Sequence, residues 1–229
     1  MKRRTFLALS ALPLAAPFVT GSSAAQTAAA PGAGPSVDEI ILRVQSFYDK
    51  TKTFKSAFKQ HFKAEAYDKT RDEAGVVTFQ KPGRMSWRYS SNGNRIVSDG
   101  KLLKVYEKEA KQMLVQPLGN GAQYTAALSF LLGQGQLKQN FKLTKQDAKL
   151  MKYPTGYVLE GIPVQPNPAC ERVLFYVDAQ TYQMRRVMLI DAQRNRNRFD
   201  FVTSEVNTAP PRGEFAFEPP PGTQIIHAP

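Results

Sequence analysis

The chain has 229 residues, of which 42% are apolar, and a formal net charge of +12. This apolar content is enough to build a hydrophobic core and excludes an intrinsically disordered body. The excess of lysine and arginine suits nucleic acid, an anionic lipid surface or an acidic protein as partner, and charge alone does not choose among them.

The first 25 residues have the pattern of an export signal. Basic residues at positions 2–4 precede an apolar run from Phe6 to Val19, and small residues at 23–25 suit cleavage after Ala25. Two prolines interrupt the run, which is too short for a membrane span. The paired arginines also resemble a twin-arginine signal, so that export route and the ordinary one both stay open. We therefore expect a periplasmic protein, for which nucleic acid is not a partner.

A leader and an amphipathic helix follow the signal. Residues 26–35 form an Ala, Pro and Gly tract without periodicity, which indicates a flexible leader. Ser36 to Glu39 then matches a capping box. Five apolar residues recur after it at helical spacing: Ile40, Ile41, Val44, Phe47 and Tyr48. No boundary divides the chain beyond this point, so we expect residues 36–229 to form a single domain.

Residues 53–67 have an ambiguous pattern. Phe54, Phe58 and Phe62 recur every four residues, a spacing that fits one face of a strand as well as one face of a helix. Periodicity alone leaves both interpretations open.

Residues 75–115 alternate apolar and polar side chains in short runs, which predicts an antiparallel meander with one dry face. Met85, Trp87 and Tyr89 share a face in this pattern, and Ser86 and Arg88 point to the other. The pairs at 92–93 (Asn-Gly) and 99–100 (Asp-Gly) suit two-residue hairpin loops.

The second half of the chain contains a further helix and more strands. Pro117 ends a strand, and the run from Tyr124 to Leu132 has the helix formers and all-round apolar character of a buried helix. Strand signals resume at 141–143, 156–160, 172–178, 183–191 and 196–206, with short extended pieces near the C-terminus. About ten or eleven antiparallel strands are too many for a flat sheet. We expect a mainly β protein whose curved sheet is covered by a helix on its open side.

Groups for catalysis or metal binding are scarce. The chain has two histidines, His61 and His227, and one cysteine, Cys170. These are too few for a hydrolase triad or a histidine or thiolate metal site, and no glycine-rich phosphate loop is present. We therefore predict no enzyme activity, no cofactor and no metal ion.

Two other groups of residues have open interpretations. Met85, Trp87, Tyr89 and Met113 are either ordinary core or the lining of an apolar hollow, because a single-layer curved sheet has few helices to fill it and an unfilled hollow costs stability. A basic group lies on the late strands and is either a solvated face or a docking face for membrane partners. It consists of Arg185, Arg186, Arg194, Arg196 and Arg198.

Three segments carry a resemblance to a known family. They are GVVTFQKPGRMSWRY at 75–89, SDGKLLKVY at 98–106 and FAFEPPPGTQII at 215–226. In order and spacing they resemble the periplasmic outer-membrane lipoprotein carrier family, LolA, and the likeness extends from about residue 37 to about residue 226. The resemblance implies an incomplete antiparallel β-barrel of about 11 strands, with a helical lid over an apolar concave face.

The resemblance also implies roles for individual residues. The acyl-chain cavity would be lined by Phe58, Phe62, Phe79, Met85, Trp87, Tyr89, Leu103, Val105, Met113 and Val115. The lid would present Tyr124, Leu128, Leu131 and Leu132. A basic residue before the proline locks the lid in this family; here it is Lys81, where relatives carry arginine, and Arg84 lies nearby. Lysine lacks the planar fork of arginine, so a multidentate lock would be weaker.

The function implied by the resemblance is a monomeric carrier that takes lipoproteins from the inner to the outer membrane. Its partners would be the acyl chains of lipoproteins, an inner-membrane lipoprotein-release ABC transporter and a LolB-like outer-membrane acceptor. Two alternatives stay open. One is a periplasmic lipid- or lipoprotein-sensing regulatory module of related fold, and the other is a periplasmic hydrolase that would depend on His61.

Overall fold

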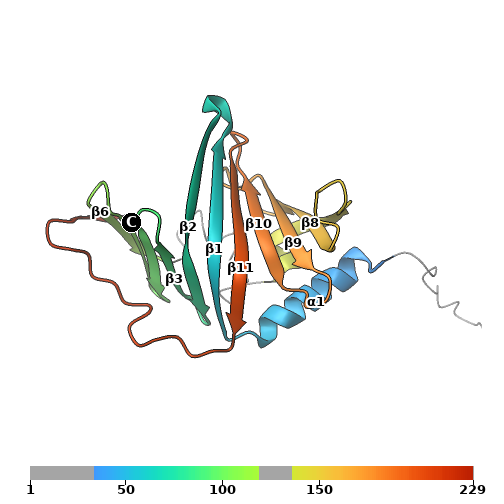
Figure 1. The fold of residues 1–229 in the computed structure, drawn as a ribbon, viewed down its shortest axis with the longest axis horizontal. Helices are drawn as coiled ribbons and strands as arrows, with labels where there is room; N and C mark the ends of the chain where they lie inside the picture. The colour runs from blue at the N-terminus through green and yellow to red at the C-terminus, as the bar shows by residue number, and fades with distance from the viewer. Residues whose placement is uncertain (1–33, 119–135, 229) are drawn as a thin grey trace, which may run out of the picture. The chain divides into compact units, whose positions relative to one another are not determined.

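The computed structural model describes residues 34–118 and 136–228, which contain twelve strands and few helices (Figure 1). The strands are β1 (Thr53–Ala64), β2 (Lys69–Gln80), β3 (Arg84–Tyr89), β4 (Arg95–Asp99), β5 (Leu102–Glu107), β6 (Gln112–Pro117), β7 (Phe141–Gln146), β8 (Gly156–Pro163), β9 (Arg172–Asp178), β10 (Met184–Ile190), β11 (Arg196–Val206) and β12 (Gln224–His227). The helices are α1 (Val37–Lys50), the short α2 (Leu137–Asn140) and the 3-10 helix η1 (Glu65–Tyr67). None of the helices in these ranges is long and apolar enough to span a membrane.

The twelve strands form one sheet in the order β12-β6-β5-β4-β3-β2-β1-β11-β10-β9-β8-β7. Neighbouring strands are antiparallel throughout, except that β12 runs parallel to β6. Among the described strands the sheet stays open, with β12 and β7 at its two ends. The predicted mainly β, antiparallel, incomplete barrel is therefore confirmed, with one strand more than the eleven expected.

The predicted capping box starts α1. The Ser36 hydroxyl accepts from the Glu39 backbone N–H at 3.2 Å, and the Glu39 carboxylate accepts from the Ser36 backbone N–H at 2.8 Å. The hydrogen bond from the Ser36 backbone lowers the pKa of Glu39. Four residues of the predicted apolar stripe are buried, and they belong to the main core of the sheet: Ile40, Ile41, Val44 and Tyr48.

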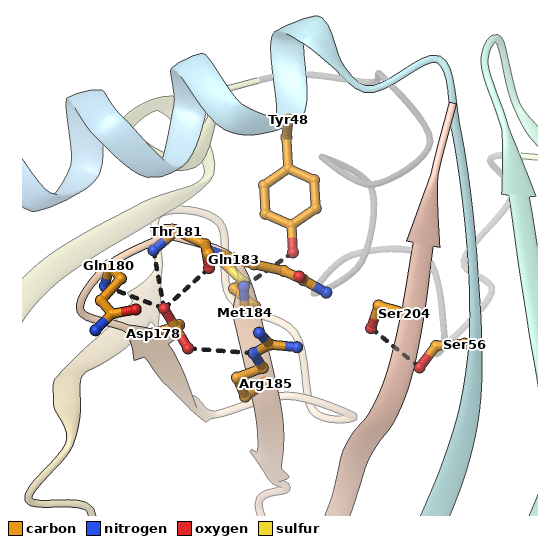
Figure 2. Close-up of polar contacts among 9 residues, drawn as sticks. All are labelled: Tyr48, Ser56, Asp178, Gln180, Thr181, Gln183, Met184, Arg185 and Ser204. Atoms are coloured by element: carbon orange, nitrogen blue, oxygen red, sulfur yellow. Dashed lines mark hydrogen bonds and ion pairs between the residues drawn. The ribbon is translucent and has the colours of Figure 1, made fainter. Parts of the chain in front are cut away.

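A buried hydrogen bond ties α1 to the sheet. The Tyr48 hydroxyl accepts from the backbone N–H of Met184 at the start of β10, at 3.0 Å (Figure 2). Burial raises the pKa of Tyr48 well above its usual range. Next to this contact, Asp178 Oδ1 accepts from the backbone N–H groups of Gln180 and Thr181, which shapes the turn between β9 and β10. The helix is therefore held at a defined place on the sheet.

Residues 53–64 form a strand, and the chain then turns through η1. β1 pairs along its whole length with β2, which brings Phe54 opposite Phe79 and Phe58 opposite Gly75. Gly75 is required here, because a Cβ would lie 2.0 Å from the carbonyl oxygen of Arg88 and 2.9 Å from the Phe58 ring. The close approach lets the Phe58 ring lie against the sheet.

One of the two predicted two-residue loops is wrong. Five residues, 90–94, join β3 to β4, because Asn92 and Asn94 close a wider turn with their own hydrogen bonds. At the second site Gly100 and Lys101 alone join β4 to β5. There Asp99 Oδ1 accepts from the backbone N–H groups of residues 101 and 102 and fixes the short turn.

The sheet has two buried faces. The inner face is the one that carries Phe58, Trp87, Phe175 and Phe199, and its core includes the apolar stripe of α1. The outer face carries two smaller clusters. One contains Tyr106, Met113 and Val115 with Phe217, and the other contains Val158, Leu174 and Tyr176.

The segment from residue 207 to residue 223 covers part of the outer face on its way from β11 to β12 (Figure 1). Phe217 packs on Tyr106 with ring centroids 5.3 Å apart, and the Arg95 guanidinium lies 5.1 Å from the Phe217 ring. Glu214, which is 3% exposed, forms an ion pair with Arg88. These contacts make the outer face of β3 to β6 a second packed layer.

Candidate functional site

An aromatic cluster forms the floor of the inner face. Trp87 packs edge to face against Phe58, Phe79 and Phe199, with ring centroids 4.9, 5.8 and 5.3 Å apart. The indole Nε1 of Trp87 is buried and has no hydrogen-bond partner in the part of the chain that the structure describes. A tryptophan N–H that finds no acceptor marks a surface made almost entirely of carbon.

The apolar floor continues across β3, β4 and β5. Trp87 pairs with Ile96, which in turn pairs with Val105, while Ser98 lies between Met85 and Leu103 in the same ladder. Paired residues project on the same side of a sheet. The floor therefore runs from β11 to β5 as an apolar strip that is interrupted on β4 by the buried Ser98.

Most of the predicted cavity residues lie together on this inner face. They are Phe58, Phe79, Met85, Trp87, Tyr89, Leu103 and Val105. Phe62 has the same parity but is half-buried near the η1 end of β1, with the Arg71 guanidinium 5.7 Å from its ring.

The structure does not bring Met113 and Val115 to the inner face. Met113 pairs with Tyr106, and Val115 pairs with Lys104, so both lie on the outer face. There they pack with Tyr106 and Phe217. The residue of β6 that shares the inner face with Val105 is Leu114. Their assignment to the cavity is corrected accordingly, because alternation along β6 identifies a buried face without saying which one.

The described helices lie over one half of the inner face. Both α1 and α2 contact β7, and Tyr48 bonds to the first residue of β10. The other half of the floor is buried as well, because Met85, Trp87 and Leu103 are each 2% exposed or less and belong to the same core cluster as the apolar stripe of α1.

Lys81 binds the C-terminal end of α1. Its Nζ donates to the backbone carbonyl of Tyr48 at 2.5 Å, where the helix dipole favours a cation. Burial lowers the pKa of Lys81, and the nearby Asp49 carboxylate opposes that shift. Arg84 is exposed at the start of β3, and its side chain has no hydrogen bond or ion pair within residues 34–118 and 136–228. The predicted lid residues Tyr124, Leu128, Leu131 and Leu132 lie outside the described residues.

The inner face becomes polar toward the η1 end of β1 and β2. Gln60 is 4% exposed, lies two residues after Phe58 on β1 and pairs with Glu73 of β2. The Glu73 carboxylate accepts from Asn92 Nδ2 at 2.8 Å and pairs with Arg71 at 3.2 Å. These residues line a hollow of about 630 Å³. Sequence reasoning missed them, although a glutamine with the parity of Phe58 and Phe62 was a visible signal.

The late-strand arginines are largely paired with carboxylates. Arg186 and Arg198 both form ion pairs with Asp200, and Arg185 lies 3.4 Å from Asp178. Arg186 also lies 5.0 Å from the Tyr176 ring. Two carboxylates thus pair with three of the five arginines, which lowers the positive charge of this surface without cancelling it.

The remaining candidates for chemistry are isolated. His61 lies on the outer face with its Nδ1 2.6 Å from Asp72 Oδ1. Cys170 is buried, and burial raises the pKa of its thiol to about 11. Among the described residues no three His, Cys, Asp or Glu side chains are placed to hold a metal ion.

Comparison with known proteins adds a decisive observation. The family model described as "Outer membrane lipoprotein carrier protein LolA" matches residues 49–218, from the end of α1 to the segment over the outer face. The chain belongs to this family. The matched LolA region contains β1 to β11, all of the apolar floor and the polar hollow.

Individual LolA relatives are similar in sequence to this chain over most of its length. The outer-membrane lipoprotein carrier protein of Methylibium petroleiphilum is 25% identical over 196 residues, which are 85% of this chain and 92% of the relative. The protein of the same name from Bordetella pertussis is 27% identical over 205 residues, covering 88% and 91%. A crystal structure of an uncharacterized conserved protein from Thermus thermophilus has a TM-score of 0.50 at 12% identity. It covers 85% of this chain and 100% of that one, and it supports the fold alone.

Proposed function

We propose that this protein is a periplasmic carrier that shields the acyl chains of lipoproteins and moves them from the inner to the outer membrane. The observation that carries the proposal is the apolar floor that crosses the inner face from β11 to β5, in a chain of the LolA family. The outer-membrane lipoprotein carrier proteins to which the chain is similar support the same function.

The energetics suit a carrier of lipid. Each methylene moved from water to an apolar surface contributes roughly 0.8 kcal/mol, so ten of them contribute about 8 kcal/mol before entropy costs. Met85 adds an adaptable side chain to the floor, which suits guests of varied shape. Release at the far membrane then requires a second state that binds the chains less tightly.

The proposed route begins at an inner-membrane lipoprotein-release ABC transporter and ends at a LolB-like acceptor. The export signal at residues 1–25, the leader at 26–35 and a single carrier domain from residue 36 complete this proposal, and they rest on the sequence. The lid at Tyr124–Leu132 is also a proposal from the sequence. Lys81 and Arg84 are its candidate locks, and Lys81 is held at α1 by the Tyr48 carbonyl.

Transfer from membrane vesicles tests the function. Purified protein is incubated with inner-membrane vesicles that contain the release machinery and a labelled lipoprotein, with ATP, and the supernatant is examined for a soluble one-to-one complex. Wild-type protein should form this complex. Its absence with active vesicles would refute the carrier function and favour the regulatory alternative.

Two variants of β5 distinguish an effect of the inner face on cargo binding from a general effect of an added charge on the protein. Val105→Asp places a charge on the half-buried inner face of β5, where it opposes burial of acyl chains. Leu102→Asp makes the same type of change on the outer face of β5, at a residue that is 40% exposed. We expect at least tenfold less complex with Val105→Asp, and no more than a twofold change with Leu102→Asp. Thermal unfolding of both variants shows whether each is folded.

A further inference from the structure

The hollow of about 630 Å³ lies at the end of the inner face opposite Lys81. Glu73 lines it, and Lys81 lies eight positions later in the chain, just after β2, which is about 26 Å along an extended strand. The hollow is therefore well separated from the C-terminal end of α1, which Lys81 binds.

The hollow joins an apolar wall to a polar wall. Ile96 and Val105 line one side, and Ile96 pairs directly with Trp87 of the apolar floor. Gln60 and Glu73 line the other side. An amphiphile whose chain lies on the floor would place its polar end between these walls.

Gln60 has an unused hydrogen-bond acceptor. Its Nε2 donates to Asn197 Oδ1 at 2.9 Å, while its Oε1 is buried and has no partner within the described ranges. A buried carbonyl oxygen without a donor costs free energy comparable to a lost hydrogen bond. Because this oxygen is closed off from the hollow in the present conformation, Gln60 accepts from a group in the hollow only after its side-chain amide turns toward that group.

The charge of the hollow selects among polar groups. Its lining contains one base, Arg71, and three acids, Glu73, Glu107 and Glu109. Arg71 and Asn92 both bind Oε1 of Glu73, so Oε2 has no hydrogen-bond partner among the residues described. Such a lining disfavours a phosphate and favours neutral or cationic groups that donate hydrogen bonds.

We propose that this hollow binds the first peptide groups attached to the acyl chains of the cargo. Their backbone N–H groups donate to Gln60 Oε1 and to the Glu73 carboxylate, while the acyl chains lie on the adjoining apolar floor. This inference rests on the proposed carrier function and assigns one part of the cargo to one end of the inner face. It also predicts discrimination against anionic phospholipids that share the same acyl chains.

Three lipids with identical chains test the assignment. They are dipalmitoylglycerol, dipalmitoylglyceryl-cysteine extended by three serines, and dipalmitoyl phosphatidylglycerol. Their affinities are measured by displacement of a fluorescent fatty acid from the full-length mature protein. Wild-type protein should bind the lipopeptide at least threefold more tightly than either of the other two.

Gln60→Met removes the acceptor and keeps the length of the side chain. We expect it to lower the affinity for the lipopeptide roughly threefold to tenfold and to leave dipalmitoylglycerol unchanged. Gln183→Met is the matched control, because Gln183 is also buried, has an unpartnered amide atom in the described structure (its Nε2, where Gln60 has Oε1), and lies at the β9–β10 turn (Figure 2). It should leave the preference for the lipopeptide as in wild type.

A surface variant tests the charge argument without touching a buried residue. Glu107→Gln combined with Glu109→Gln changes two exposed side chains at the rim and should raise the affinity for the phosphatidylglycerol twofold to threefold, roughly as expected for exposed charges.

The outcomes distinguish the two proposals. If wild-type protein binds none of the three lipids, the carrier function fails, and this inference fails with it. If all three bind with equal affinity, or if Gln60→Met weakens lipopeptide and dipalmitoylglycerol equally, the carrier function survives and the peptide site is refuted. If Gln60→Met does not fold, the variant with Glu107→Gln and Glu109→Gln decides. An affinity for phosphatidylglycerol equal to that of wild type would then refute the proposed discrimination against anionic lipids.

Discussion

Replacing Tyr48 by phenylalanine tests whether α1 is held on the sheet by the buried contact with β10. The substitution keeps the ring and removes only the hydroxyl that accepts from Met184 N–H at 3.0 Å. The buried N–H then has lost its partner, which costs about 1–3 kcal/mol. A folded unit of this size shifts by roughly 2–4 °C per kcal/mol, so the midpoint of thermal unfolding should fall by about 2–12 °C.

The chain provides its own probe for this measurement. Trp87 is the single tryptophan and is 1% exposed on the inner face, so its fluorescence reports unfolding of the core directly. Urea titrations of wild type and Tyr48→Phe give the free energy of unfolding. Tyr67→Phe is the control, because Tyr67 is 77% exposed. If the two variants differ by less than about 0.3 kcal/mol, the Tyr48 hydroxyl does not hold the helix.

Three further substitutions or labels test other contacts. Lys81→Met removes the hydrogen bond to the Tyr48 carbonyl and should lower the free energy of unfolding in urea by about 1 kcal/mol, whereas Arg84→Met at an exposed site should change it by less than about 0.5 kcal/mol. Hydrogen bonds from the Thr181 backbone lower the pKa of Asp178 below its ordinary 3.8, so its stabilisation is complete above that pH and is lost as pH falls through the folded-state pKa. Asp178→Asn should therefore flatten the acid limb of a stability-versus-pH curve. Cys170, with a thiol pKa of about 11, should react with a disulfide reagent at pH 8 about 100-fold more slowly in the native protein than in urea; equal rates would contradict its burial.

Local patterns were sufficient to predict much of this fold. The capping box at Ser36 predicted the start of α1, because its hydrogen bonds join residues three apart and need no tertiary contact. Alternation placed Met85, Trp87 and Tyr89 on one face of β3, because side chains in a strand have a period of two.

Features that depend on distant residues could not be predicted in this way. The acceptor for Lys81 is a carbonyl 33 positions earlier in the chain, and no local pattern identifies it. The polar hollow joins Gln60 of β1 to Asn92 and Glu109 from two later turns. Asn92 and Glu109 look like ordinary surface side chains in their own segments, and the parity of Gln60 predicts its burial without identifying its neighbours. Only the strand order brings them to one end of the inner face.

The assignment of Met113 and Val115 to the wrong face has a physical cause. Alternation along a strand shows that every second residue is buried, but it does not identify the layer that buries them. On β6 the burying layer includes Phe217, from a distant part of the chain, which packs against Met113 and Val115 on the outer face. If only the inner face of the sheet were covered, the buried apolar residues of β6 would have to lie on that inner face. Here both sides are covered. Alternation along a strand therefore identifies the cavity residues only when it is known which residues of that strand lie on the same face as Trp87.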